Sequence, residues 1–302
     1  MNKVIDFINN NNLGAFKENV SFKNLTTYRC GGNAKLVYFP NCIPSLITFL
    51  KFAKEENIEY KVFGNGSNIL ASDDNYDGII IKLNNLDKYK LDEETSTLEV
   101  EAGCGVMILA NLISKMGYSG LEFACGIPGT IGGAVYMNAG AYLKSFSDIL
   151  VSATLLDNNF NIIELTNEEL EFSYRKSILS DNKYIVLSAQ LKLEKKDVEE
   201  ITKIINERLH RRIDSQPLEY PSAGSVFRNP EGDFAGRLIE ECNLKGMMYG
   251  GAEISGKHAN FIINKENAKS SDIKYLMELA QKKVEEKFDI KLHREQELFN
   301  FK

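Results

Sequence analysis

The residues best suited to chemistry lie in a glycine-rich segment near the middle of the chain. Between positions 122 and 142, glycine recurs beside Pro128 and Asn138 among mainly apolar side chains. Glycine lets the backbone approach a ligand closely, and clustered backbone N–H groups bind anions. A ligand-free turn is the alternative, although few turns need so many glycines. The segment therefore predicts a backbone cradle for a large flat or phosphorylated cofactor. The expected cradle residues are Gly126, Ile127, Pro128, Gly129, Thr130, Gly132, Gly133, Asn138, Ala139 and Gly140.

A second, shorter glycine turn spans residues 64–68 and follows an apolar stretch that we expect to be a strand. Its backbone could hold a pyrophosphate by the same chemistry. It is not a Rossmann fingerprint, because Ile69 occupies the third glycine position of that motif. A tight turn without a ligand explains this stretch equally well when it is taken alone. The candidate binding residues are Gly64, Asn65, Gly66, Ser67 and Asn68.

The cysteines give no sign of a metal site or a disulfide framework. They are odd in number, scattered, and never two residues apart in a Cys-x-x-Cys pair. We expect free, buried thiols in a reducing compartment and no bound metal. The five positions are Cys30, Cys42, Cys104, Cys125 and Cys242.

The elements expected around the two glycine segments alternate between helix and strand. Residues 42–57 carry a helical apolar stripe with Pro44 in the first turn. The apolar, β-branched pattern of strands occurs at residues 60–63 and 78–83, on either side of the glycine turn at residues 64–68. The first 85 or so residues therefore predict a small β-α-β unit.

The middle and the end of the chain follow a similar pattern. Strands are expected at residues 98–102, 149–156 and 184–193, and a helix at 106–116. Asp197 opens a further helix, with Glu200 at capping-box spacing. A last long helix is expected at 271–288, followed by a strand-like stretch at 290–292.

This order of elements predicts an α+β protein. The strand-rich middle changes near residue 195 to a charged helix, which suggests a domain boundary there. We expect three parts: residues 1–85, residues 86–195 and residues 196–302.

The bulk composition excludes several functional classes. The chain has 302 residues, of which 43% are hydrophobic and 26% are charged, and its net charge is -6. An acidic balance argues against a nucleic-acid binder. No apolar run approaches the ~20 residues of a membrane span. The N-terminus has no signal-peptide core, so a cytoplasmic location is expected.

The two glycine segments together resemble the FAD-binding domain of the vanillyl-alcohol oxidase and p-cresol methylhydroxylase type. More narrowly, the chain resembles the UDP-N-acetylenolpyruvoylglucosamine reductase family over nearly its whole length. The supporting motifs are residues 64–68, 126–142, 174–177, 223–230, 235–240 and 257–264, with Glu295 near the C-terminus.

The resemblance implies a two-subdomain FAD-binding domain followed by a smaller α/β substrate-binding domain. It implies non-covalent FAD, NADPH as co-substrate, and UDP-N-acetylglucosamine enolpyruvate as the substrate, in peptidoglycan precursor synthesis. Ser225 matches the family's proton donor. Arg175 is expected to pair with the substrate carboxylate, and Glu295 to help hold that carboxylate or to position the proton relay.

Four further residues are candidates for substrate binding: Tyr142, Arg228, Asn229 and His258. Two of them have structural alternatives: Tyr142 could lie at a core rim, and His258 could be a structural histidine. The chain passes directly from the 184–193 strand to the helix at Asp197, so it resembles the shorter of two family types. The expected protein is a monomer with no nucleic-acid or membrane partner.

Two other functions are alternatives to this one. Another FAD-dependent oxidoreductase of the same superfamily would not need the Ser225, Arg175 and Glu295 set. A nucleotide-binding protein without activity would have no reason to keep all three residues. NADPH dependence and weak reactivity toward oxygen distinguish the reductase from an oxidase.

Overall fold

In the computed structural model, residues 1–181 and 184–301 are described. The chain divides into two compact units, and each contains its own buried apolar cluster. The first unit comprises Met1–Glu18, Leu36–Asn65 and Gly78–His210, and the second comprises Asn19–Lys35, Gly66–Asp77 and Arg211–Lys302. The finer division into three parts, at residues 85 and 195, stays a prediction.

A four-stranded sheet in the order β1-β2-β5-β3 lies mainly in the first unit, and a few end residues of β1, β2 and β5 belong to the second. Strands β3 and β5 run parallel, with Tyr60 opposite Ile79 and Phe63 opposite Lys82. Helix α2 buries Phe49 in the core of this unit, so the helix and the two strands predicted here are confirmed. The bounds are β1 Gly14–Ser21, β2 Asn33–Pro40, α2 Ile43–Glu55, β3 Tyr60–Phe63 and β5 Tyr76–Lys82.

A helix that the sequence analysis missed, α1 (Asn2–Asn10), begins the chain. Its composition is polar and rich in asparagine, but Val4 and Ile8 fall on one face and are buried. The Phe7 ring stacks on Phe52 of α2 with 3.8 Å between the ring centroids.

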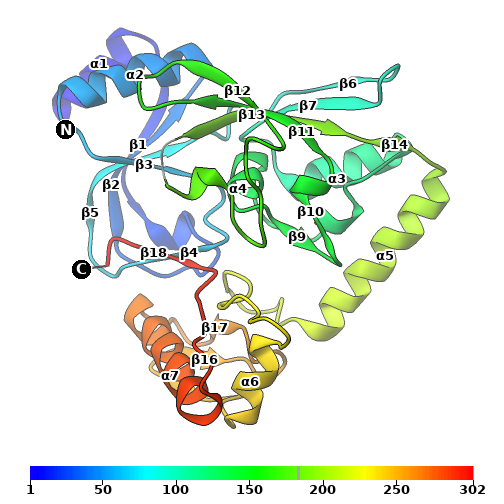
Figure 1. The fold of residues 1–302 in the computed structure, drawn as a ribbon. Helices are drawn as coiled ribbons and strands as arrows, with labels where there is room; N and C mark the ends of the chain where they lie inside the picture. The colour runs from blue at the N-terminus through cyan, green and yellow to red at the C-terminus, as the bar shows by residue number, and fades with distance from the viewer. Residues whose placement is uncertain (182–183, 302) are drawn as a thin grey trace. The chain divides into compact units, whose positions relative to one another are not determined.

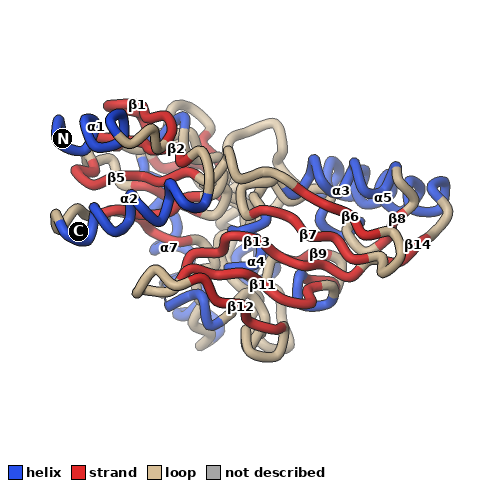
Figure 2. The backbone as a smooth tube through the Cα atoms, turned by 90° about the horizontal axis from the view of Figure 1, so that it is seen from above, coloured by secondary structure: helices blue, strands red, loops and turns tan. Residues whose placement is uncertain are grey.

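A five-stranded antiparallel sheet forms the other part of the first unit, in the order β12-β11-β13-β7-β6 (Figure 2). The short helix α4 contacts β13 and β7. The strands predicted around residues 98–102, 149–156 and 184–193 are confirmed as β7, β11 and β13. The bounds are β6 Tyr89–Asp92, β7 Thr97–Glu101, α4 Ile131–Tyr136, β11 Leu150–Leu156, β12 Ile162–Thr166 and β13 Ile185–Lys192.

The remaining elements of the first unit are short, apart from two helices. The Oδ1 atom of Asp197 accepts hydrogen bonds from the backbone N–H groups of Glu199 and Glu200, so Asp197 caps the helix as predicted. The bounds are α3 Val106–Lys115, β8 Tyr118–Ser119, β9 Gly140–Ala141, β10 Lys144–Ser145, β14 Glu194–Lys195 and α5 Val198–Ser215, whose residues from Arg211 onward belong to the second unit. Short 3-10 helices occupy Glu122–Ala124, Phe146–Asp148 and Ile178–Asp181, and another occupies Phe22–Asn24 in the second unit.

In the second unit, helix α7 lies on the small antiparallel sheet β15-β16-β17 (Figure 1). Strand β18 pairs in parallel with β4, with Leu298 opposite Leu70. The bounds are β4 Ile69–Ala71, α6 Ala235–Glu241, β15 Met248–Tyr249, β16 Ala252–Ile254, β17 Ile262–Asn264, α7 Ser270–Phe288 and β18 Glu297–Phe299.

The strand expected at residues 290–292 is wrong. Leu292 is buried, and its carbonyl accepts a hydrogen bond from Gln281 of α7 rather than from a neighbouring strand. The apolar pattern therefore reflects packing after the helix, and the strand of this region is β18. All five cysteines are free, as expected, but Cys42 is exposed and Cys242 is only half-buried.

The α+β class is confirmed by this mixture of helices with antiparallel and parallel strands. In the described part of the chain, no helix has the length and apolar character needed to cross a membrane. Within residues 1–181 and 184–301, no cluster of His, Cys, Asp and Glu side chains is arranged to hold a metal ion.

Candidate active site

The glycine-rich segment of the first unit is fixed by backbone hydrogen bonds to the end of β7. The N–H groups of Ile131 and Gly132 donate to the carbonyls of Cys104 and Ala102, at 2.9 and 2.8 Å. A Cβ added at Gly132 would lie 3.0 Å from the Cβ of Ala102. A side chain at Gly132 would therefore press against Ala102 inside the protein.

The two glycine segments meet within this unit. The side-chain amide of Asn65 donates to the carbonyl of Pro128 at 3.1 Å. A Cβ added at Gly64 would lie 2.7 Å from the Oγ1 atom of Thr130. The first half of the 64–68 turn therefore packs directly against the segment that leads into α4.

Gly133 and Lys82 have properties that the protein interior does not explain. Gly133 is exposed in helix α4, and a Cβ there would meet only the Thr130 hydroxyl oxygen, at 3.6 Å. Lys82 is only 9% exposed and lies opposite Phe63, directly before the Gly64 turn. Burial, with no compensating charge among the described residues, lowers the pKa of Lys82. The open space beside Gly133 and the buried cation of Lys82 next to the Gly64 turn fit a dinucleotide with a charged diphosphate.

The second half of the same turn belongs to the second unit. Gly66 has φ 64°, and a Cβ there would overlap the carbonyl oxygen of Leu25 at 2.2 Å. The Gly66 carbonyl accepts from the N–H of Thr27, whose hydroxyl oxygen is buried without a hydrogen-bond partner among the described residues. An orphaned hydroxyl beside a glycine turn also fits a phosphate ligand.

Asn68 has a structural contact that the sequence did not indicate. Its side-chain amide donates to the carbonyl of Glu295 at 3.0 Å, and its own carbonyl accepts from the N–H of Glu297. The last residue of the turn thus holds the backbone at Glu295 in place.

The segments that carry Ser225 and Glu295 pair with each other in the second unit. The N–H of Glu295 donates to the carbonyl of Val226, the neighbour of Ser225, at 2.8 Å. The two segments continue as an antiparallel pair, with Phe227 opposite Arg294. This pairing joins residues that are 70 positions apart in sequence into one local structure.

The segment that carries Ser225 is anchored by Asn260, which the sequence analysis did not single out. Asn260 is 3% exposed, and its side chain both accepts from the N–H and donates to the carbonyl of Phe227, at 3.0 and 2.8 Å. Its carbonyl also accepts from the N–H of Val226. A buried amide that bonds through both its oxygen and its nitrogen fixes the backbone next to Ser225.

Arg175 belongs to the first unit, so the structure describes it separately from Ser225 and Glu295. It lies in a tight turn with φ 57°, and its Nη2 atom donates to the carbonyl of Gly140 at 2.6 Å. The buried Asn138 donates to the carbonyl of Ser173 in the same turn and accepts from the N–H of Ser147. The end of the glycine-rich segment therefore supports the Arg175 turn.

Of the expected substrate-binding residues, Tyr142 is paired within the protein, whereas Arg228 keeps a buried nitrogen without a partner among the described residues. The Tyr142 hydroxyl donates to the Arg208 carbonyl at 2.7 Å, and the guanidinium of Arg208 lies over its ring. The N–H of Arg228 donates to the carbonyl of His293, while its buried Nε atom has no hydrogen-bond partner among the described residues. An unpaired guanidinium nitrogen is suited to an anionic ligand.

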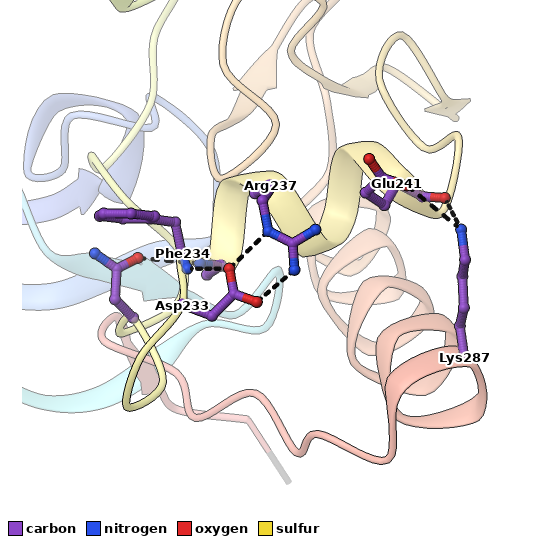
Figure 3. A network of polar contacts seen from close by, with 7 residues as sticks. Asp233, Phe234, Arg237, Glu241 and Lys287 are labelled. Atoms are coloured by element: carbon purple, nitrogen blue, oxygen red, sulfur yellow. Dashed lines mark hydrogen bonds and ion pairs between the residues drawn. The ribbon is translucent and has the colours of Figure 1, made fainter.

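Asn229 accepts a hydrogen bond from the N–H of Ala235 at 3.1 Å, so its side chain satisfies the first turn of α6. Figure 3 shows the same turn. Asp233 accepts hydrogen bonds from the N–H of Phe234 and from the Nε and Nη2 atoms of Arg237. The hydrogen bonds from Arg237 and Phe234 lower the pKa of Asp233 to about 2. At the C-terminal end of α6, Lys287 of α7 donates to the carbonyl of Glu241 (Figure 3).

His258 is largely enclosed by protein. Its ring packs against Phe261 with 4.8 Å between centroids, and its Nδ1 atom accepts from the N–H of Asn260 at 3.2 Å. Burial lowers the pKa of His258, and the nearby Lys245 adds to this effect. The neutral imidazole therefore supports the Asn260 backbone.

Comparisons with known proteins cover both units. A family model described as UDP-N-acetylenolpyruvoylglucosamine reductase, C-terminal domain, matches residues 216–299. A model described as FAD binding domain matches residues 34–166.

Similar proteins extend over the full chain. The UDP-N-acetylenolpyruvoylglucosamine reductase of Clostridium novyi (strain NT) is 44% identical, with 92% of this chain and 90% of the relative aligned. That of Bacillus licheniformis is 42% identical over 100% of both chains. The crystal structure of the reductase from Thermus caldophilus superposes with a TM-score of 0.81 and 34% identity, covering 94% of this chain and 100% of that one.

Proposed function

The chain belongs to the UDP-N-acetylenolpyruvoylglucosamine reductase family, and from this premise we propose that it reduces UDP-N-acetylglucosamine enolpyruvate to UDP-N-acetylmuramate. The family membership confirms the resemblance that the motifs indicated. The protein is an FAD-dependent oxidoreductase with NADPH as co-substrate, and its product is a peptidoglycan precursor. No observation favours the alternative of another oxidoreductase of the wider superfamily.

When bound, FAD supplies the hydride chemistry that links NADPH to C3 of the enolpyruvyl ether. In the first unit, the backbone around residues 64–65 and 126–140 would hold it, with Lys82 as a candidate counter-charge for the diphosphate. In the second unit, Gly66, Ser67 and the Thr27 hydroxyl are proposed separately as phosphate contacts. The protein's part is to bind this cofactor, orient the substrate and stabilise the charge that develops.

Ser225 is the proposed proton donor to C2 of the substrate. Hydride addition at C3 leaves negative charge at C2, which spreads into the adjoining carboxylate. A serine hydroxyl is a weak acid, but the C2 carbanion is a strong base, so a correctly placed hydroxyl suffices. In the described part of the chain, no group fixes the Ser225 hydroxyl by a hydrogen bond, which leaves it available to the substrate.

Arg175 and Glu295 would act on the developing charge. The planar guanidinium of Arg175 suits a paired hydrogen bond with the substrate carboxylate. Glu295 must be protonated or paired when it faces the enolate, because two like charges repel. We therefore propose that substrate binding raises the pKa of Glu295.

One observation carries the assignment of the proton donor. The 2.8 Å hydrogen bond from the Glu295 N–H to the Val226 carbonyl pairs the segment that carries Glu295 with the segment that carries Ser225. This arrangement supports joint action of a hydroxyl donor and a carboxyl group at one carbon atom.

The test is the variant Ser225→Ala, compared with Ser222→Ala in the same segment. Ser225→Ala is expected to keep FAD and to accept hydride from NADPH at the wild-type rate. Reduction of the enolpyruvyl substrate should slow by about a hundredfold or more, which is the usual size of a general-acid contribution. Wild-type turnover by Ser225→Ala would refute the assignment of the proton donor.

The cellular context follows from the same proposal. An enzyme that makes a nucleotide-linked wall precursor would work in the cytoplasm and would be needed for cell shape and cell division. We also propose that the chain acts as a monomer on its small-molecule substrate, without nucleic-acid or membrane partners.

A further inference from the structure

Gln296, the residue after Glu295, has its side chain fully engaged in hydrogen bonds inside the second unit. It is 4% exposed. Its Nε2 atom donates to the carbonyls of Ala223 and Gly224 at 3.1 and 3.0 Å. Its Oε1 atom accepts from the hydroxyl of Tyr28 at 2.9 Å. Both hydrogens of the amide are therefore directed at the two residues that precede Ser225.

The turn before Ser225 depends on these bonds for its position. Gly224 has φ 75°, and a Cβ there would meet no atom within 4 Å, so side-chain packing does not hold this residue. On the other side of Ser225, Asn260 fixes Val226 and Phe227 by the hydrogen bonds described above. Ser225 is thus clamped between two buried amides.

Tyr28 determines which way the Gln296 amide faces. Its ring is fully buried, and burial strongly raises its pKa, so the hydroxyl keeps its proton and remains a donor. A donor at this point requires the oxygen of the Gln296 amide to face Tyr28, which directs the nitrogen toward the Ser225 turn. The Tyr28 backbone is itself held, because Asn264 donates to its carbonyl at 2.9 Å.

Packing alone gives no reason for an amide at this position. An apolar side chain of similar volume would fill the same space without the cost of burying polar atoms. The side chain that is present instead links the backbone at Glu295 to the turn at Ser225. Its bonds join the two residues that the proposed function assigns to proton delivery.

We infer that Gln296 is a positioning residue, which holds the Ser225 hydroxyl in place for proton transfer to the substrate. The inference rests on the proposed function, because only the step that uses Ser225 should depend on Gln296. Hydride transfer from NADPH needs neither Ser225 nor the turn that carries it. The two halves of the reaction should therefore respond differently to loss of this amide.

The test uses the holoenzyme with the variant Gln296→Met, which keeps the volume and removes the amide. Stopped-flow absorbance follows flavin reduction by NADPH, and then flavin reoxidation by UDP-N-acetylglucosamine enolpyruvate. Reduction should stay within about twofold of wild type. Reoxidation should slow by about tenfold to a hundredfold, the usual effect of a small misplacement of a reacting group.

A solvent isotope measurement separates positioning from general damage. In Gln296→Met, reoxidation in D₂O should slow by a larger factor than in wild type, because proton transfer becomes more rate-limiting. The matched control is Gln281→Met, since Gln281 donates to the carbonyl of Leu292 and makes no contact with the Ser225 turn. The control should leave both half-reactions and the isotope effect unchanged.

A second variant covers the case in which Gln296→Met does not fold. Tyr28→Phe removes only the hydroxyl that orients the amide, and it should slow reoxidation selectively by a smaller factor. Wild-type reoxidation in both variants, or an equal loss in both half-reactions, would overturn the inference. A wild-type enzyme that fails to be reoxidised by the enolpyruvate substrate would instead overturn the proposed function, and this inference with it.

Discussion

The variant Gly133→Ala should separate the needs of the fold from the needs of the cofactor. Gly133 lies in α4, and its added Cβ would be in ordinary contact with one atom of the protein, 3.6 Å away. Alanine is favoured over glycine inside a helix by about 0.5–1 kcal/mol. The apoprotein should therefore gain about that much stability, which corresponds to roughly 2 °C in Tm for a domain of this size.

Binding of FAD should change in the opposite direction. If the space beside Gly133 is used by the cofactor, a methyl group there produces overpacking that costs about 1–3 kcal/mol. That penalty weakens binding by about fivefold to 150-fold, since each 1.4 kcal/mol is tenfold. The measurement is quenching of flavin fluorescence on titration of the apoprotein, with thermal unfolding of the same preparation.

The matched control is Gly132→Ala, where the added Cβ lies 3.0 Å from the Cβ of Ala102. This control should lower the stability of the apoprotein, because the neighbours must move. Unchanged FAD affinity in Gly133→Ala would refute the reasoning, since the glycine would then face neither protein nor cofactor.

Three further predictions concern individual side chains. Asp73 accepts hydrogen bonds from the N–H groups of Ser270 and Ser271 at the start of α7, so Asp73→Ala should lower the free energy of unfolding by about 1 kcal/mol in urea titrations; no change would mean that water replaces the cap. Asn138→Ala removes two buried hydrogen bonds and should cost about 1–3 kcal/mol by the same assay, whereas a loss below 0.5 would contradict its supporting role. Because burial lowers the pKa of His258 below its usual 6.5, neutral His258 contributes stability that is fully present above that pH and is lost as the pH falls through the lowered pKa. His258→Gln should therefore flatten the fall in stability below pH 6.5, and parallel pH profiles for variant and wild type would contradict this.

Sequence patterns identified the elements that carry strong local signals. Helices α2, α3 and α7 and strands β3, β7 and β11 begin and end within about two residues of their predicted bounds, because apolar periodicity and caps are local properties. Strand β18 was missed, since it is short and pairs with β4 across more than 200 positions of sequence. The sequences of β4 and β18 contain no local pattern that shows which strand each one pairs with.

In the candidate site, too, local motifs could be read from the sequence, whereas contacts between distant residues could not. Motifs predicted the glycine segments as the cofactor site and Ser225, Arg175 and Glu295 as catalytic residues, and these roles stay predictions. The supporting contacts of Asn68, Asn260 and Gln296 could not be predicted, because an amide side chain gives no sequence signal of the carbonyl that it will meet. The oxygen of Asn229 accepts a hydrogen bond from the N–H of Ala235 in the first turn of α6, and its contact with the substrate stays a prediction.

The most direct test of the proposed function is NADPH oxidation by the purified protein, with and without UDP-N-acetylglucosamine enolpyruvate. A flavin-containing protein that oxidises NADPH only when this substrate is present, and that forms UDP-N-acetylmuramate in equal amount, is the predicted result. Oxidation of NADPH at the same rate without the substrate, with no such product, would contradict the assignment.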